Sequence, residues 1–212
     1  MMLDREGVTL ALADLEQAFP KVSCALEHED AFTLLVATML SAQCTDKQVN
    51  RVTPALFEKY PHPKDFAALT PTELEPLIKS CGFYHDKARN IIAACIALVT
   101  RFNGEVPSTM EELVSLPGVG RKTANVVLSN AFNVPAIAVD THVFRVSNRI
   151  GLAQAKDVEK TEKQLMENIP KELWSVSHHR LIALGRQICS ARNPKCGVCA
   201  LREVCSYNAV LR

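Results

Sequence analysis

Four cysteines near the carboxyl end of the chain have the spacing of a metal site. They are Cys189, Cys196, Cys199 and Cys205, separated by six, two and five residues. Four thiolates this close in sequence can surround a tetrahedral zinc ion or a four-iron cluster. In an intracellular protein, such crowding favours metal binding over disulfide bonds. The spacing therefore predicts a metal and leaves zinc and iron–sulfur both open.

The loop between the first two cysteines is basic. It contains Arg192 and Lys195 and no acidic residue. A bound metal would hold this loop rigid, and a rigid loop with two cations is well suited to contacting phosphate groups. An electron carrier is the alternative interpretation of the cysteines, but the basic residues do not require it.

A glycine-containing turn at residues 116–120 indicates a second phosphate contact. Gly118 and Gly120 flank Val119, just before a helix expected over residues 121–132. Such a turn leaves N–H groups pointing outward beside a helix N-terminus, where a phosphate can bind. Residues 108–111 have the form of a capping box that opens a short helix before the turn. A helix, hairpin and helix of this kind grips the DNA backbone without reading bases. A plain connection between two helices, where glycine is common, is the alternative.

Lys122 lies in the first turn of the second helix. The apolar stripe of that helix contains Ala124, Val127, Leu128 and Ala131, so Lys122 is expected on nearly the opposite side, facing solvent. The amine of a lysine can act as a nucleophile and form a Schiff base. The alternative is an ordinary surface lysine.

Asp140 follows the apolar residues 137–139 and precedes a segment in which Val143, Val146 and Ile150 have helical spacing. It is therefore placed to cap the N-terminus of a helix. Capping alone would explain an aspartate here, and a catalytic carboxylate is the second interpretation. We assign no role to His142.

Apolar residues recur at helical spacing along almost the whole chain, and no sustained two-residue alternation occurs. The fold class is therefore predicted to be all-α, with about ten helices separated by proline and glycine. Residues 31–40 are apolar on nearly all sides, which indicates a central buried helix.

Charge is distributed unevenly, although the net charge of the 212 residues is only +1. Residues 1–30 have a net charge of −5, and residues 171–212 have a net charge of +5. This split suggests one surface that faces a polyanion, or solvated faces that happen to differ. The charged beginning of the chain and the short apolar stretches predict a soluble, intracellular protein that does not associate with membranes.

Three features occur together in the right order: LPGVGRKTA at 116–124, VDTH at 139–142, and the cysteine spacing. In these features the chain resembles the endonuclease III family, the iron–sulfur type of the helix-hairpin-helix DNA glycosylase superfamily. The likeness runs from about residue 32 to residue 207 and includes LSAQCTD at 40–46. It implies two helical lobes with the active site in the cleft between them. Residues 25–134 would carry the hairpin, and residues 1–24 with 135–212 would carry the cluster.

The resemblance also implies an activity. The protein would be a bifunctional DNA glycosylase and abasic-site lyase of base excision repair, acting as a monomer on duplex DNA with damaged bases or abasic sites. It would excise oxidised pyrimidines through a Lys122 Schiff base, with Asp140 as the acidic partner, and cleave the strand by β-elimination. The location would be cytoplasmic, associated with the nucleoid in a bacterium.

Further site residues follow from the same resemblance. The four cysteines would hold a [4Fe–4S] cluster. Gln43 and Phe83 would enter the duplex to fill the gap left by an extruded nucleotide. Phe83 stands where we expect leucine in relatives, and its alternative is a core aromatic at a helix end. The residues expected to contact DNA elsewhere are Gly118, Val119, Gly120, Arg121, Arg192 and Lys195.

Two rival functions are weighed against this one. An adenine-removing mismatch glycosylase of the same superfamily lacks a lysine at the position of Lys122 and carries an extra C-terminal domain, whereas this chain ends seven residues after Cys205. A non-enzymatic DNA-binding protein would explain the hairpin and the cysteines, but it gives no reason for Lys122 and Asp140 together.

Overall fold

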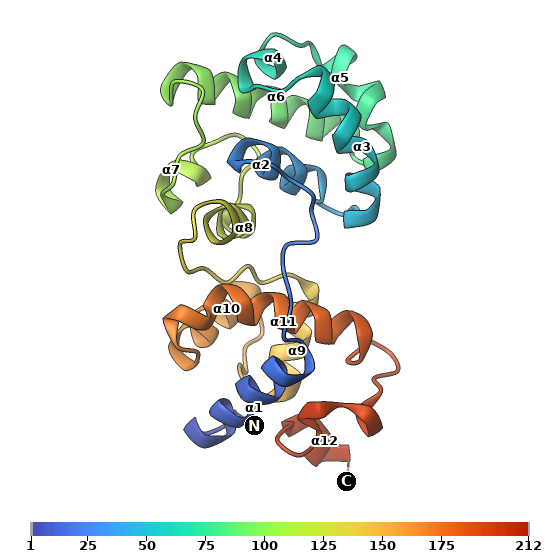
Figure 1. Cartoon of the computed structure of the whole chain (residues 1–212), viewed down its shortest axis with the longest axis vertical. Helices are drawn as coiled ribbons and strands as arrows, with labels where there is room; N and C mark the ends of the chain where they lie inside the picture. Colours follow the sequence, from blue (N-terminus) through green and yellow to red (C-terminus); the bar gives the residue numbers. More distant parts are fainter. Residues whose placement is uncertain (1, 212) are drawn as a thin grey trace. The chain divides into compact units, whose positions relative to one another are not determined.

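The computed structural model describes the backbone of residues 2–211 and the side chains of residues 2–208. Its helices form two compact units, which can be followed by sequence colour in Figure 1. Unit 1 combines Met1–Ser23 with Pro135–Arg212, and unit 2 is the continuous segment Cys24–Val134. The expected domains, 25–134 and 1–24 with 135–212, stay a prediction.

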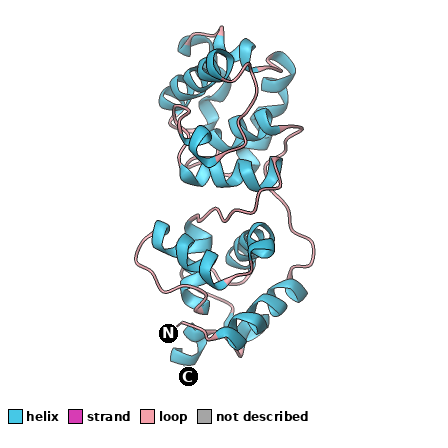
Figure 2. Cartoon of the chain, turned by 90° about the vertical axis from the view of Figure 1, so that its left-hand side faces the viewer, coloured by secondary structure: helices cyan, strands magenta, loops and turns pink. Residues whose placement is uncertain are grey.

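The described residues contain helices and loops and no strand, as Figure 2 shows. The all-α prediction is therefore confirmed. Twelve α-helices lie within residues 2–211, where the sequence indicates about ten. The difference comes from short helices such as α4 (Pro63–Ala67), which are too short to show a clear hydrophobic period.

Unit 2 is built around α2 (Ala31–Leu40). Asp30 caps this helix: the backbone N–H of Thr33 donates to Asp30 Oδ1 at 2.7 Å, and the Asp30 N–H donates to Thr33 Oγ1 at 3.0 Å. All residues from Phe32 to Leu40 are buried, which confirms the predicted central helix. The other elements of unit 2 are α3 (Asp46–Lys59), α4, α5 (Pro71–Ile78), the 3-10 turn η1 (Lys79–Cys81), α6 (Tyr84–Arg101), α7 (Met110–Val114) and α8 (Arg121–Ala131).

Unit 1 joins the first helix of the chain to its last third. Arg180 makes the join, because its Nη2 donates to Glu16 Oε1 at 2.8 Å and its Nε donates to the Phe19 carbonyl at 3.4 Å. Leu15 and Leu181 are fully buried in the same apolar core. The elements are α1 (Arg5–Ala18), α9 (Thr141–Ile150), α10 (Val158–Asn168), η2 (Lys171–Leu173), α11 (Trp174–Gln187), η3 (Cys196–Val198), η4 (Ala200–Arg202) and α12 (Ser206–Leu211).

One local prediction is wrong by one residue. The capping box before the hairpin was expected at 108–111, but Thr109 is the cap of α7 and Glu112 is its partner. The Thr109 hydroxyl accepts from the Glu112 N–H at 3.3 Å and donates to Glu112 Oε2 at 2.7 Å. Successive Ser108 and Thr109, followed by successive Glu111 and Glu112, allow either register in the sequence.

None of the helices described is both long enough and apolar enough to cross a bilayer.

Candidate functional site

In unit 2, the hairpin turn between α7 and α8 is anchored by its apolar residues. Leu116 and Val119 are buried, and the Val119 N–H donates to the Leu116 carbonyl at 3.1 Å. Gly118 and Gly120 are exposed. The backbone N–H of Val119 is thus used within the turn, and the exposed residues of the turn are Pro117, Gly118 and Gly120.

Gly118 is required at its position for two reasons. Its φ of +74° is a conformation that side chains disfavour, and a Cβ built there would lie 2.6 Å from the Cβ of Asn90. Asn90 belongs to α6, so the turn is pressed against that helix. The glycine therefore allows the close approach that fixes the turn before Lys122.

Lys122 is exposed in the first turn of α8, while Ala124, Val127 and Leu128 are buried on the other side. The prediction that Lys122 faces away from the core is confirmed. Cys24 lies within electrostatic range of Lys122: burial raises the pKa of the Cys24 thiol, and the charges of Asp46 and Lys122 act on it in opposite directions. No local pattern in the sequence indicates that Cys24 would lie within range of both Asp46 and Lys122.

Gln43 and Phe83 occupy two separate loops of unit 2. Both have left-handed backbone conformations, with φ of 52° and 48°. Both are exposed, and the exposed fraction of Phe83 is 61%. A large aromatic side chain this accessible is not part of the core, so the alternative interpretation of Phe83 is wrong.

Asp140 belongs to unit 1, where it caps α9. Its Oδ1 accepts from the Val143 N–H at 2.7 Å, and the residue is half-buried. The predicted N-cap is confirmed. Because this hydrogen bond uses one carboxylate oxygen, it fixes the side chain while the second oxygen keeps its capacity to accept a proton or to face a positive charge.

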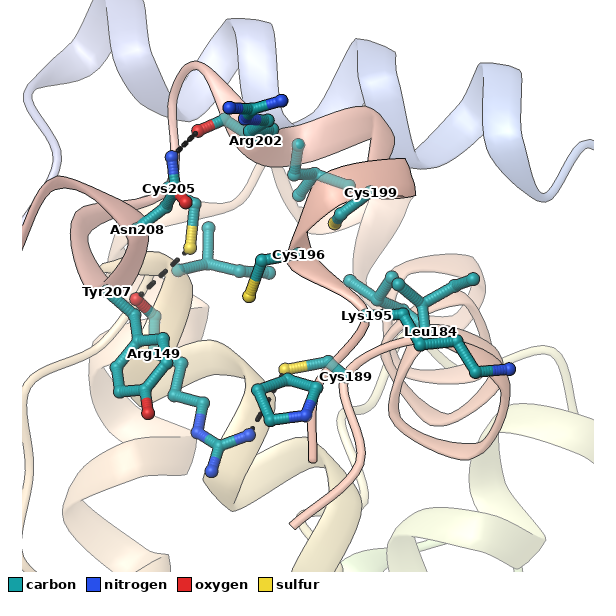
Figure 3. Close-up of a pocket in the computed structure, with 14 residues that line it drawn as sticks. Arg149, Leu184, Cys189, Lys195, Cys196, Cys199, Arg202, Cys205, Tyr207 and Asn208 are labelled. Atoms are coloured by element: carbon teal, nitrogen blue, oxygen red, sulfur yellow. Dashed lines mark hydrogen bonds between the residues drawn. The ribbon is translucent and has the colours of Figure 1, made fainter. Parts of the chain in front are cut away.

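The four C-terminal cysteines line one pocket in unit 1. Figure 3 shows Cys189, Cys196, Cys199 and Cys205 around the same space, with Arg149 and Tyr207 at its edge. Burial raises the pKa of the Cys199 thiol, and the other three thiols raise it further, so the four groups lie within electrostatic range of one another. The sequence spacing therefore corresponds to a cluster of thiols in space.

The chemistry of the donor set can be compared with the two kinds of metal site. The pocket offers four thiol groups, and thiolates are the ligands of iron–sulfur clusters as well as of structural zinc. The residues that line the pocket therefore fit a four-iron cluster.

Two arginines of α9 brace the start of the cysteine loop, and the sequence analysis missed both. Arg145 Nη2 donates to the carbonyls of Gly185 and Cys189, each at 3.0 Å. Arg149 donates to the carbonyls of Ser190 at 2.7 Å and Ala191 at 2.8 Å, and its Nη1 lies 3.5 Å from Cys189 Sγ. Two arginines four residues apart on one helix were the available signal. With these carbonyls paired, Arg192 and Lys195 stay exposed on the loop.

Family models match most of the chain. Residues 36–171 match the model described as HhH-GPD superfamily base excision DNA repair protein. Residues 189–205 match the iron-sulfur binding domain of endonuclease III. The second match covers all four cysteines of the pocket.

Curated relatives match over nearly the full length. Endonuclease III of Bacillus subtilis is 52% identical over 205 residues, covering 96% of this chain and 94% of the relative. Endonuclease III of Escherichia coli is 44% identical over 196 residues, covering 92% and 93%.

Solved structures match equally well. A trapped endonuclease III–DNA covalent intermediate, an estranged-adenine complex, is 50% identical and covers 100% of both chains with a TM-score of 0.94. A non-covalent endonuclease III–DNA complex is also 50% identical, covers 99% of both chains and has the same TM-score. A thermostable thymine-DNA glycosylase, with 22% identity and a TM-score of 0.84, shares the fold.

The role of Gly118 in the turn can be measured by substitution. Gly118→Ala places a Cβ at positive φ, which costs about 1–2 kcal/mol, and adds the overlap with Asn90, which costs about 1–3 kcal/mol more. Gly104→Ala is the matched control, because Gly104 has a φ of +80° and nothing within 4 Å of the added Cβ. Urea unfolding should show a clearly larger loss for Gly118→Ala. Equal losses would contradict the close approach of Asn90.

Proposed function

Because the chain belongs to the endonuclease III family of the HhH-GPD superfamily, we propose that Lys122 is its nucleophile and Asp140 the acidic partner of that amine. The chain is a DNA glycosylase and abasic-site lyase of base excision repair. The observation that carries the assignment is the exposed amine of Lys122 directly after a turn suited to phosphate. The covalent intermediate trapped for a relative that is 50% identical requires a nucleophile, and Lys122 supplies one.

The proposed reaction begins with a nucleotide extruded from the duplex, since a stacked base hides its sugar. The Lys122 nitrogen bonds to C1′ as the bond from C1′ to the base breaks, and the departing base takes up a proton. Asp140 accepts a proton from the amine and stabilises positive charge on the sugar. Opening of the sugar ring then gives a Schiff base. Loss of a C2′ proton expels the 3′ phosphate and cleaves the strand.

The cap of α9 gives Asp140 its fixed position in this scheme. The bond from the Val143 N–H holds one oxygen, so the charge of the carboxylate stays at the N-terminus of the helix. A carboxylate is also favoured there by the helix dipole. The same side chain thus serves the helix and the reaction.

The substrate class we propose is oxidised or ring-saturated pyrimidines in duplex DNA. Such damage weakens pairing or stacking and makes extrusion easier. Gln43 and Phe83 would fill the vacated space, supported by their exposure. Gly118, Gly120 and Arg121 would hold the DNA backbone at the hairpin, and the buried Val119 would contribute by anchoring the turn. We propose a monomer acting on nucleoid DNA in the cytoplasm.

The chain carries a [4Fe–4S] cluster, and we propose Cys189, Cys196, Cys199 and Cys205 as its ligands. The four thiols around one pocket support this assignment. When bound, the cluster supplies iron–thiolate bonds that cross-link the loop. Arg192 and Lys195 would then meet phosphate from a rigid backbone. The curated endonuclease III relatives, 52% and 44% identical over nearly the full length, favour neither rival function.

Substitutions at the two proposed catalytic residues should have different effects on base excision and on lyase action. Lys122→Gln removes the attacking amine, so base excision and borohydride trapping should both fall by about 100-fold or more while the duplex still binds. Asp140→Asn keeps the helix cap but loses the charge, so excision should fall by a similar factor. Lyase action on a preformed abasic site should suffer less, because its aldehyde is already available to Lys122.

Borohydride trapping on duplexes with oxidised pyrimidines, an abasic site or no damage measures the covalent step, and titration with the same duplexes measures binding. Asp157→Asn is the matched control, since Asp157 caps α10 by accepting from the Lys160 N–H at 2.8 Å. If Lys122→Gln traps at the wild-type rate, another amine is the nucleophile.

The cysteine loop should contribute to DNA affinity electrostatically. Replacing Arg192 and Lys195 by glutamine should flatten the plot of log Kd against log salt concentration by about 1 to 2 units of slope, one for each lost phosphate contact. Replacing Lys156 and Lys163, which are exposed in the same unit, removes the same charge. An equal change in slope for both pairs would mean that the effect is general and not specific to the loop.

Metal content tests the cysteine assignment. Pure protein should contain about four irons per chain and absorb in the thiolate-to-iron charge-transfer region. Cys199→Ser should lower the iron content and weaken DNA binding, whereas Cys24→Ser should leave the iron content unchanged. Stoichiometric zinc without iron would refute the assignment.

A further inference from the structure

Lys87 takes no part in the chemistry above, and we propose that it is the positioning residue for Gln43 and Phe83. Its ammonium ties together the two loops that carry these side chains. The inference rests on the proposed entry of Gln43 and Phe83 into the duplex, and it adds the group that holds them ready to do so.

The contacts of Lys87 join segments far apart in the chain. Its Nζ donates to the carbonyl of Leu40 and to the carbonyl of Cys81, each at 2.8 Å. Leu40 is the last residue of α2, and Cys81 is the last residue of η1. Only 6% of the Lys87 surface is exposed, so the ammonium is unavailable to contact a phosphate. The ammonium instead donates its hydrogen bonds to backbone carbonyls inside unit 2.

Both carbonyls that Lys87 contacts lie two or three residues before the exposed residues. Gln43 is three residues after Leu40, and Phe83 is two residues after Cys81. The positive φ values of Gln43 and Phe83 are costly and persist only where the surrounding structure enforces them. The backbone N–H of residue 87 donates to the Phe83 carbonyl at 3.0 Å, but this is the first helical hydrogen bond of α6 and does not depend on the side chain. The Lys87 ammonium therefore holds each of the two loops at one point.

A second contact joins the same two segments. Gln48, in the first turn of α3, donates from its Nε2 to the hydroxyl of Ser80 at 2.9 Å. This bond is on the exposed side, where water competes. The Lys87 bonds are buried and charge-assisted, so they are the stronger link.

The proposed insertion of Gln43 and Phe83 into the duplex requires a rigid link between their two loops. Inserting side chains into a duplex unstacks bases, which costs free energy. The loops that carry the inserted side chains must therefore resist displacement. If the loops yield, the side chains retreat and the nucleotide stays stacked. A single ammonium that donates to both loops keeps the two side chains at a fixed spacing.

Lys87→Met tests this role, because methionine has a similar length and no donor. The holoenzyme is bound to a duplex in which 2-aminopurine lies opposite a tetrahydrofuran abasic analogue. The fluorescence of 2-aminopurine rises when this base is unstacked. We expect Lys87→Met to bind undamaged DNA within about threefold of wild type, since the hairpin and basic loop are untouched. The rate of the fluorescence rise, and of single-turnover excision, should fall by about 10- to 100-fold.

Leu98→Ala separates positioning from stability. Leu98 is fully buried in the same helix, eleven residues or about 16 Å from Lys87. It should weaken the unit against urea and leave the fluorescence rise intact. If Lys87→Met behaves like Leu98→Ala at equal loss of stability, the inference is wrong. Should Lys87→Met not fold, Lys87→Gln keeps donors on a shorter chain and should show an intermediate loss. A wild-type rise for Lys87→Gln would also overturn the inference.

Phe83→Ala and Gln43→Ala distinguish this inference from the function on which it rests. If they abolish the fluorescence rise and Lys87→Met does not, only the role of Lys87 is refuted. If they leave the rise intact, the proposed entry of these side chains is refuted, and the inference fails with it.

Discussion

Backbone carbonyls at the ends of helices need hydrogen-bond donors, and this requirement shapes the Gln43 and Phe83 loops and the cysteine loop. Helical hydrogen bonding stops at the ends of α2, η1 and α11, so their last carbonyls need other partners. In each case a cation from a neighbouring helix provides the donor. Lys87 serves Leu40 and Cys81, and Arg145 and Arg149 serve the carbonyls of Gly185, Cys189, Ser190 and Ala191. The backbone is held from within, which leaves the exposed side chains to meet the duplex.

Helix α9 combines two duties in unit 1. Its N-terminus is capped by Asp140, and its later turns carry Arg145 and Arg149 against the cysteine loop. A change in the shape of that loop therefore acts on the same helix that Asp140 caps, and Asp140 is the carboxylate proposed to act in the reaction. Iron–thiolate bonds across the loop would stabilise the packing of α9 from the loop side.

Sequence patterns predicted the helices and their caps better than the long-range hydrogen bonds that hold the loops between them. The apolar stripe of α8 was enough to place Lys122 outward, and an aspartate before a helical pattern was enough to identify the cap of α9. Lys87 escaped notice because a lysine is by default assigned to the surface. Its burial depends on carbonyls 47 and 6 residues away, and no local period encodes that distance. Phe83 was likewise hard to place, because its hydrophobicity indicates burial. It is exposed in the structure, where it follows Gly82 in a left-handed backbone conformation.

The order of the units along the chain has a consequence for synthesis on the ribosome. Unit 2 is continuous, whereas α1 needs α9 and α11 to cover Val8, Ala11 and Leu15. At about 5–20 residues per second, the ribosome takes roughly 8 to 34 s to synthesise the chain from the end of α1 to the end of α11. The apolar face of α1 therefore stays uncovered until the last third of the chain has emerged.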